Sequence, residues 1–405
     1  MTDNSMKSLA SLRDLKKIGF IVPSSNTALE PITAHIIAHQ LAGRVSVHFS
    51  RVAVRTLDTD EESVAQFGTE KMLASAALLA DADLDAILWN GTAASWSGKG
   101  MQADIELAEE ITRATGLPCS TSTLAQVEVL EAYGVKQLAL AGPYGDGPMR
   151  GLVAFYEGLG YAVVGTAQMG ARENVVFGNT PLERIRELIR AADRPEAECV
   201  VVACTNWPAA LVVEEMEAAL GKPVYDSVCV TLWAAMRAVG VGVPLFGWGK
   251  LLRDDPALRE ADAVMEALLG ACAASRVTLR LDVPRWNCHV DAVCAEACAR
   301  GVASLRLDAS LNQRAMRTVQ WLERTRAVLV QGDLAATEVE PPKALVDVYG
   351  VRAQMLAPLV RGEEVYGWVS VHQVGRTRVW TEGEVGELRG AVERVEGILA
   401  AHGWI

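Results

Sequence analysis

The sequence predicts an α/β protein: two pseudo-symmetric halves, each built on a parallel sheet of βαβ units with the site between them, followed by a separate α+β domain. Three observations support this fold class. Short apolar runs alternate with amphipathic helical stretches up to about residue 250. The order of these segments restarts near residue 133. After residue 250 one lysine stands beside 17 arginines, whereas 8 lysines and 12 arginines precede it.

The first half, about residues 15–132, follows an N-terminal arm of residues 1–14. KKIGFIV has the short apolar pattern of a buried parallel strand. Turn residues and a helical apolar period follow it. Further strands are expected at 45–54 and 83–90, a short extended segment at 117–123, and helices within 23–41, 61–82, 105–116 and 123–134.

The second half, about residues 133–250, repeats this order. KQLALAGPYGDG mirrors KKIGFIVPSSN, and strands at 161–169 and 198–203 alternate with helices at 181–192 and 212–221. Parallel strands end at a common sheet edge, where α/β proteins bind ligands. The loops at 23–27, 90–95, 143–147 and 204–208 are therefore expected to meet in one catalytic domain spanning residues 15–250.

Residues 251–405 have a different pattern, which indicates an α+β domain. Strands are predicted at 276–283, 303–308 and 327–333, and LAPLVRGEEVYGWVSVHQ reads as a hairpin. Helices are predicted at 256–275, 289–301, 313–326 and 382–403.

Composition excludes several classes of protein. The formal charge of −12 and the lack of basic runs argue against nucleic acid and anionic membranes as partners. No apolar stretch is long enough to span a membrane, and the N-terminal residues lack a signal-peptide pattern. We therefore expect a cytoplasmic protein with free thiols.

Eight cysteines include a cluster, Cys288, Cys294 and Cys298, beside His289. Its spacing lacks the paired CxxC pattern of structural zinc sites. Cys294 and Cys298 also fit one face of a helix, where cysteine acts as a small apolar residue. The metal interpretation is the weaker one, and we expect no metal.

Cys204 is the strongest catalytic candidate, because it lies between the apolar run CVVVA and the segment TNWP. A helix beginning at Pro208 would stabilise its thiolate. The alternative is an ordinary buried cysteine.

The other candidates are hydrogen-bond donors in the converging loops. Ser25 and Asn26 follow the first strand and suit either carboxylate binding or helix capping. Gly91 and Thr92 follow the third strand. Tyr144 and Thr205 complete the set of loop donors, although Tyr144 fits a packed core equally well. Tryptophans near these loops, Trp89, Trp96 and Trp207, suit either an apolar pocket or the core.

The segments VPSSNTALEP, GPYGDG, RENVVFG, ACTNWP and PVYDSVCVTLW resemble the aspartate/glutamate racemase superfamily, in its branch of maleate cis-trans isomerases and arylmalonate decarboxylases. The resemblance covers about residues 15–248. It implies a cofactor-free site between two similar halves, with Cys204 as the second-half thiol. It also implies carboxylate contacts at Asn26, Tyr144 and Asn174. The first-half thiol position falls on Gly91, as in the decarboxylases.

These features predict a cofactor-independent enzyme that forms an enediolate from a small dicarboxylic or malonate-like acid. Decarboxylation needs only charge stabilisation and one proton donor, here Cys204. Racemisation and maleate isomerisation each need a second acid–base group. Those two reactions remain the alternatives, together with a non-catalytic carboxylate-binding sensor.

The segments RVTLRLD, EACARGVASLRLD, LNQRAMRTVQWLE, YGVRAQMLAPLV and EVYGWVSVHQ resemble a GAF domain. This resemblance implies a module that binds an unidentified small ligand or promotes dimerisation. We accordingly expect a homo-oligomer.

Overall fold

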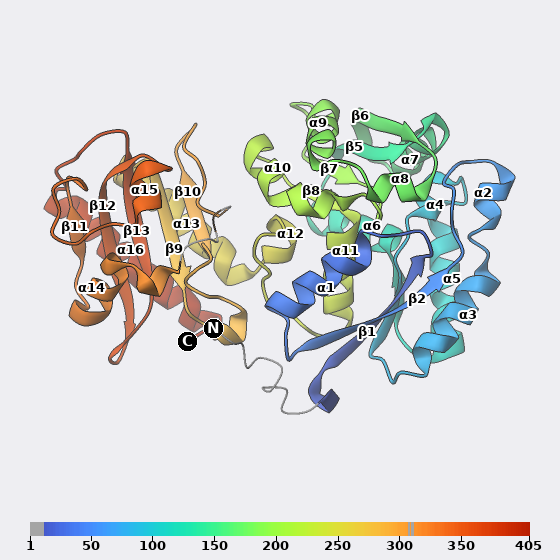
Figure 1. Cartoon of the computed structure of the whole chain (residues 1–405), viewed down its shortest axis with the longest axis horizontal. Helices are drawn as coiled ribbons and strands as arrows, with labels where there is room; N and C mark the ends of the chain where they lie inside the picture. The colour runs from blue at the N-terminus through green and yellow to red at the C-terminus, as the bar shows by residue number, and fades with distance from the viewer. Residues whose placement is uncertain (1–11, 307, 309–311) are drawn as a thin grey trace. The chain divides into compact units, whose positions relative to one another are not determined.

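The computed structural model describes residues 12–306, 308 and 312–405, so most of the predicted N-terminal arm lies outside the described residues. Its last three residues, Leu12–Asp14, form a 3₁₀ helix. The chain divides into two compact units (Figure 1). The first runs to Gly242 and includes Trp248–Leu252, and the second comprises Val243–Gly247 and Arg253–Ile405. None of the described helices has the length and apolar character needed to cross a membrane.

The first half of the first unit is built on a parallel sheet of strand order β2-β1-β3-β4. Helices alternate with the strands along the chain, as the sequence predicts. The elements are β1 (Lys16–Pro23), α1 (Leu29–Gln40), β2 (Val45–Val52), α2 (Glu61–Ala65), α3 (Thr69–Ala80), β3 (Ala86–Trp89), α4 (Ala93–Trp96), α5 (Gly100–Thr115), β4 (Cys119–Thr121) and α6 (Ser122–Ala132).

The second half has a parallel sheet of order β6-β5-β7-β8, the same order four strands later. The predicted duplication is therefore confirmed. The elements are β5 (Gln137–Tyr144), α7 (Asp146–Gly158), β6 (Ala162–Ala171), α8 (Asn174–Gly178), α9 (Leu182–Ala192), β7 (Cys199–Val202), a 3₁₀ helix (Pro208–Val212), α10 (Val213–Leu220), β8 (Val224–Asp226), α11 (Ser227–Ala238) and α12 (Lys250–Arg253).

The two halves are joined through α6 and α11, which begin at equivalent places. Thr121 caps α6 by accepting a hydrogen bond from the N–H of Leu124, and Asp226 caps α11 through the N–H groups of Val228 and Cys229. Both helices follow the last strand of their sheet directly. Their packing brings the ends of the two sheets together.

The single helix predicted over residues 61–82 is wrong, because the structure has two helices there. The side chain of Asp60 caps α2, and the chain leaves the helical conformation at Gly68 (φ −73°, ψ 135°) before α3 begins. The break places Phe67 against the cavity described below.

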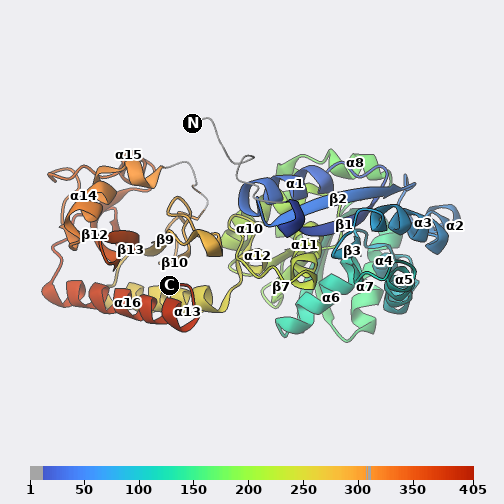
Figure 2. The same ribbon diagram turned by 90° about the horizontal axis from the view of Figure 1, so that it is seen from below.

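The second unit contains an antiparallel sheet of order β10-β9-β13-β12-β11, and the predicted α+β class and hairpin are confirmed. Helices α13 and α16 cover one face, and α14 and α15 lie on the other (Figure 2). The elements are α13 (Pro256–Ala271), β9 (Arg276–Leu281), β10 (Ala295–Cys298), α14 (Arg317–Thr325), β11 (Leu329–Gln331), α15 (Lys343–Asp347), β12 (Val351–Arg361), β13 (Glu364–Val374) and α16 (Glu382–Ala401).

Two predictions in this unit are wrong. Residues 289–301 form no helix: Ala295–Cys298 is the edge strand β10, which pairs with β9, so Cys294 and Cys298 do not share a helical face. Pairing with a neighbouring strand overrides the local helical pattern. The strand predicted at 303–308 lies partly outside the described residues, and its described part forms no strand.

Candidate active site

A small cavity with an empty volume of about 270 Å³ lies between the two halves of the first unit. The last residues of β1 and β5 and the loops after β3 and β7 line it, so each of the four segments that the sequence predicts to converge contributes. Its lining residues are Pro23, Leu57, Phe67, Gly91, Thr92, Ala93, Trp96, Tyr144, Asn174, Cys204, Thr205 and Asn206. Six of the eight predicted site residues thus lie around one space.

Two threonines tie the halves together by reciprocal hydrogen bonds. Thr92 Oγ1 donates to the carbonyl of Ala203 at 3.1 Å, and Thr205 Oγ1 donates to the carbonyl of Asn90 at 3.2 Å. Each hydroxyl crosses from its own strand end to the equivalent strand end of the other half. This exchange fixes the loops that carry Gly91 and Cys204, which occupy equivalent places.

Cys204 is 2% exposed and lies two residues after the end of β7. Burial raises the pKa of its thiol to about 11, although hydrogen bonds from the Tyr144 hydroxyl and from the N–H groups of Asn206 and Trp207 lower it. The predicted stabilisation of the thiolate by N–H groups is present, at Asn206 and Trp207. The segment after it is a short 3₁₀ helix, and desolvation outweighs its N–H groups. At neutral pH Cys204 is a protonated thiol.

Tyr144 lies at the end of β5 with its hydroxyl at the centre of the site. The hydroxyl donates to the carbonyl of Ala203 at 2.7 Å and lies 3.1 Å from Thr92 Oγ1. Burial raises the pKa of Tyr144 well above its ordinary value, so the phenol stays protonated and can act as a donor.

Gly91 occupies the position equivalent to Cys204, and the surrounding structure leaves no room for a side chain there. A Cβ atom at residue 91 would lie 2.2 Å from Cζ2 of Trp89, whose indole is fully buried. Contacts shorter than 3.0 Å require the neighbour to move. The first half of the site is thus packed for glycine.

Asn206, which the sequence interpretation did not single out, joins three loops. Its Oδ1 accepts from the N–H groups of Thr27 (2.8 Å) and Ala28 (3.2 Å), and its Nδ2 donates to the carbonyl of Asn174 at 2.6 Å. The mirror relation between SSN at 24–26 and CTN at 204–206 could have indicated this residue, because both asparagines end a strand–loop junction.

Ser25 and Asn26 lie behind the cavity and do not line it. Ser25 Oγ donates to the carbonyl of Val54 and accepts from Asn174 Nδ2 at 2.9 Å. Asn26 Oδ1 accepts from the N–H groups of Ala28 and Leu29 at the start of α1.

The side-chain nitrogen of Asn26, Nδ2, donates a hydrogen bond to Thr205 Oγ1 at 3.3 Å. In the structure Asn26 therefore caps a helix and orients Thr205, and Ser25 orients Asn174.

Apolar side chains form one wall of the cavity. Phe67 packs edge-on against Trp96, with ring centroids 5.7 Å apart, and Leu57 and Pro23 extend the surface. Of the three tryptophans considered above, Trp96 lines the cavity, while Trp89 and Trp207 belong to the buried surroundings.

The polar wall contains neutral hydrogen-bonding groups. None of the described residues that line the cavity is Lys, Arg, His, Asp or Glu, and Cys204 is the sole thiol among them. Across residues 12–306, 308 and 312–405, no group of three or more His, Cys, Asp or Glu side chains is arranged to hold a metal ion.

Comparison with known proteins agrees with this geometry. The profile described as arylmalonate decarboxylase matches residues 18–252. A maleate isomerase of Nocardia farcinica is 26% identical over 249 residues, which cover 60% of this chain and 98% of that protein. An arylmalonate decarboxylase of Bordetella bronchiseptica is 29% identical over 156 residues, 38% of this chain and 65% of that protein.

Solved structures give the same picture. A mutant maleate cis-trans isomerase of Nocardia farcinica, solved with a covalently bound succinylcysteine intermediate, has a TM-score of 0.55 and 25% identity. The match covers 60% of this chain and 99% of that chain. The GAF domain profile matches residues 257–399, so the predicted resemblance of the second unit is confirmed.

Proposed function

The chain belongs to the arylmalonate decarboxylase family, and from that premise we propose that it decarboxylates a small monosubstituted malonate without a cofactor, with Cys204 as the proton donor. The alternatives within the family differ in how many acid–base groups they need. The acid–base groups available around Gly91 therefore distinguish these reactions.

The observation that favours decarboxylation is the pairing of one protonated thiol with a glycine. A racemase needs an acid and a base on opposite faces of a planar carbanion. Opposite Cys204, the equivalent position is Gly91, and Trp89 fills the space beside it. Tyr144 is the other titratable group on the cavity wall, and its raised pKa makes it a poor base.

The proposed reaction breaks the bond between the α-carbon and one carboxylate. Carbon dioxide leaves, and the bonding electron pair stays on the α-carbon and spreads into the remaining carboxylate as an enediolate. The Cys204 S–H bond then gives its proton to the α-carbon, leaving a thiolate that water reprotonates. A pKa of about 11 suits this step, because the thiol is protonated before the reaction and is restored afterwards.

The two walls suit the two carboxylates of such a substrate. When the substrate binds, the hydroxyls of Thr92, Tyr144 and Thr205 would turn their hydrogens from the carbonyls of Ala203 and Asn90 to the retained carboxylate, where they would stabilise the charge that develops on it. The departing carboxylate, placed against Phe67 and Leu57, would lose hydration that carbon dioxide does not need. The wall of aromatic and aliphatic side chains also accommodates an apolar substituent.

Maleate isomerisation is the second candidate, because the maleate isomerases match over nearly their whole length. Addition of a thiolate to the double bond requires ionised Cys204, which burial disfavours. A second proton-handling group would also have to come from outside the described cavity wall.

Incubation of the purified full chain with phenylmalonate, methylmalonate and maleate in heavy water distinguishes these reactions. We expect release of carbon dioxide from a malonate and one deuterium introduced at the α-carbon of the product by the protonation step, measured by NMR. Formation of fumarate from maleate, with no carbon dioxide from any malonate, would overturn the proposal.

A further inference from the structure

Cys288 and Cys294 lie against each other near the end of β9 in the second unit. Cys288 forms an antiparallel bridge with Val283, just past that strand, and the N–H of Cys294 donates to the carbonyl of Leu279 at 2.9 Å. Both side chains are fully buried in the apolar core that includes α13 and α16. A hydrogen bond links the two thiols. The fold thus holds two free cysteines side by side, as a disulfide requires.

Cys294 is the more acidic thiol of this pair. Burial raises its pKa, and hydrogen bonds from the Cys288 thiol and the Leu281 N–H lower it. The charges of Arg280 and Arg253 lower it further, and the net shift is below the ordinary pKa of a thiol. Arg253 Nη1 also donates to the carbonyl of Cys294 at 3.0 Å, which holds this guanidinium beside it.

The other seven cysteines of the chain all have raised pKa values, with burial as the main cause. The thiolate is the form that reacts with oxidants. Cys294 is therefore the cysteine most suited to such a reaction, and its nearest thiol is Cys288.

We propose that Cys288 and Cys294 are a redox-active dithiol, which hydrogen peroxide converts reversibly into a disulfide. The Cys294 thiolate attacks one peroxide oxygen, so that an S–O bond forms, the O–O bond breaks, and the departing hydroxide takes up the proton that Cys294 released. The sulfur of Cys288 then attacks the sulfenic sulfur. The S–S bond forms, the S–O bond breaks, and a second water leaves with the proton of Cys288.

In this reaction two electrons pass from the two sulfurs to the peroxide, and two molecules of water are the by-product. Two equivalents of a small thiol such as glutathione reverse it, because they reduce the disulfide and are themselves oxidised.

The peroxide reaches the thiols through the segment between β9 and β10. Over residues 282–294, all of which the structure describes, the chain contains one short 3₁₀ helix, Pro284–Trp286, and the residues Arg285, His289 and Asp291 are exposed. Segments with little regular structure open locally at a small cost in free energy. Such an opening admits a molecule the size of peroxide while the rest of the domain stays folded.

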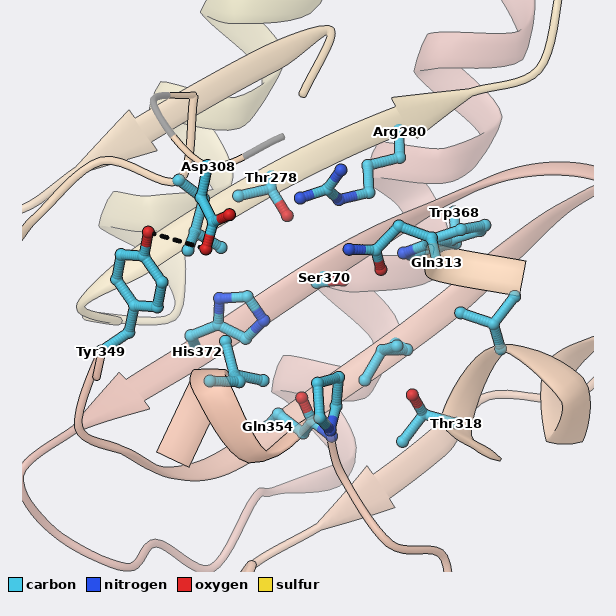
Figure 3. Close-up of a pocket in the computed structure, with 15 residues that line it drawn as sticks. Thr278, Arg280, Asp308, Gln313, Thr318, Tyr349, Gln354, Trp368, Ser370 and His372 are labelled. Atoms are coloured by element: carbon cyan, nitrogen blue, oxygen red, sulfur yellow. Dashed lines mark hydrogen bonds between the residues drawn. The ribbon is translucent and has the colours of Figure 1, made fainter. Parts of the chain in front are cut away.

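The disulfide would close a ring around residues 289–293, which help to place Arg280. The carbonyls of Val290 and Asp291 both accept from Arg280 Nη1 at 2.8 Å. Arg280 lies on the opposite face of the sheet, among the residues around a cavity with an empty volume of about 520 Å³ (Figure 3). Oxidation should therefore hold this loop, and the position of Arg280, more firmly.

The test treats the folded full chain with hydrogen peroxide, alkylates the remaining thiols with iodoacetamide in denaturant and digests the protein with trypsin. One tryptic peptide, residues 286–300, contains Cys288, Cys294 and Cys298. We expect mass spectrometry to find it with one alkyl group, on Cys298, and with two hydrogens fewer. Dithiothreitol before alkylation should restore alkylation of all three cysteines. Hydrogen exchange at the amides of residues 289–293 should slow by about tenfold in the oxidised protein.

Cys298→Ser is the matched control variant. Cys298 lies on β10 and is partly exposed, and none of the described groups that shift its pKa is a cysteine. This variant should form the disulfide as the natural protein does, whereas Cys288→Ser should form none.

The decisive result comes from the natural protein, so it does not depend on the folding of a variant. The proposal is overturned if Cys288 and Cys294 both remain alkylatable after a dose of peroxide that oxidises the partly exposed Cys119 and Cys298. A disulfide that joins Cys298 to either of the two would overturn it as well.

Discussion

The indole of Trp89 occupies the space that a side chain at residue 91 would fill: a Cβ atom on Gly91 would lie 2.2 Å from Cζ2 and 2.5 Å from Cε2 of Trp89. Trp89 ends β3, and Gly91 lies in the following loop and lines the same cavity as Cys204, so the steric constraint lies within the site itself. A thiol at residue 91 therefore requires the Trp89 ring to move.

Introducing a second thiol should therefore destabilise the protein. Gly91→Cys is expected to lower the free energy of unfolding by about 1–3 kcal/mol, as overpacking of a core does, because the Trp89 ring has to move. Urea denaturation measures this change. Gly158→Cys is the matched control, since a Cβ there meets no atom within 4 Å. Equal stability of the two variants would show that the Trp89 ring can move aside without an energetic cost.

Removing the proton donor should abolish most turnover. We expect Cys204→Ala to reduce kcat for the accepted malonate by about 10²–10⁴-fold, the usual contribution of a general acid, with little change in substrate binding. Carbon dioxide release and product NMR provide the measurement. Cys119→Ser is the control, because Cys119 is partly buried at the start of β4 and does not line the cavity. Unchanged turnover in the alanine variant would exclude Cys204 as the acid.

The pH dependence should be that of a thiol acid. With a pKa of about 11, about one Cys204 in a thousand is ionised at pH 8. Turnover should therefore stay level through neutral pH and fall only as the pH approaches 11. Alkylation of Cys204 by iodoacetamide, followed by mass spectrometry, should be slow at pH 8 and quicken towards pH 10. Rapid alkylation at pH 7 would point to a thiolate nucleophile.

Asp226 should make the folded protein less stable as the pH rises. Burial raises its carboxyl pKa to about 7 in the folded state, so the unfolded chain releases this proton first. The stabilisation is complete below about pH 4 and is lost as the pH rises to 7, by on the order of 4 kcal/mol.

Asp226→Asn removes the titration and keeps an acceptor for the start of α11. Its free energy of unfolding should change less between pH 4 and 7 than that of the natural protein. In the variant, the unpaired Oδ2 of Asp226 becomes an amide nitrogen without a partner, which lowers stability at every pH. The two proteins are therefore compared by how steeply the free energy of unfolding changes with pH, and not by its absolute value. Identical slopes in the two proteins would contradict a protonated Asp226.

Asn206 should contribute strongly to both stability and catalysis. Asn206→Ala leaves the N–H of Thr27 and the carbonyl of Asn174 without this partner. We expect a loss of about 2–3 kcal/mol in the free energy of unfolding and a lower kcat/KM. Asn179→Ala removes an exposed amide whose one hydrogen bond to a described residue is with the Val175 carbonyl, so it should change stability by less than about 0.5 kcal/mol. Equal losses of stability in the two variants would show that the hydrogen bonds of Asn206 do not stabilise the loops that they join.

The sequence predicted well which residues lie at the ends of the strands. It did not predict whether their side chains point into the cavity or towards the backbone. Cys204 and Thr92 follow apolar runs that form parallel strands, so their place at a common edge follows from topology. Ser25 and Asn26 occupy an equivalent strand end, yet they turn towards backbone groups instead of the cavity. Asparagine and serine satisfy either role, and the choice depends on neighbours from distant segments.

The errors have physical causes. The segment that contains Cys294 has a helical pattern, but pairing with β9 makes it a strand. The helix interruption that positions Phe67 depends on the Asp60 cap and the extended backbone at Gly68.

By itself, the sequence determined two parallel halves, a following α+β domain and a lone thiol opposite a glycine. Apolar periodicity and residue identity are local properties, and the chain order records them directly. The tertiary structure decided that burial raises the pKa of the Cys204 thiol and that Trp89 fills the space beside Gly91. Desolvation and steric exclusion depend on what surrounds a group, and in a folded chain those surroundings come largely from residues that the order of the sequence does not place together.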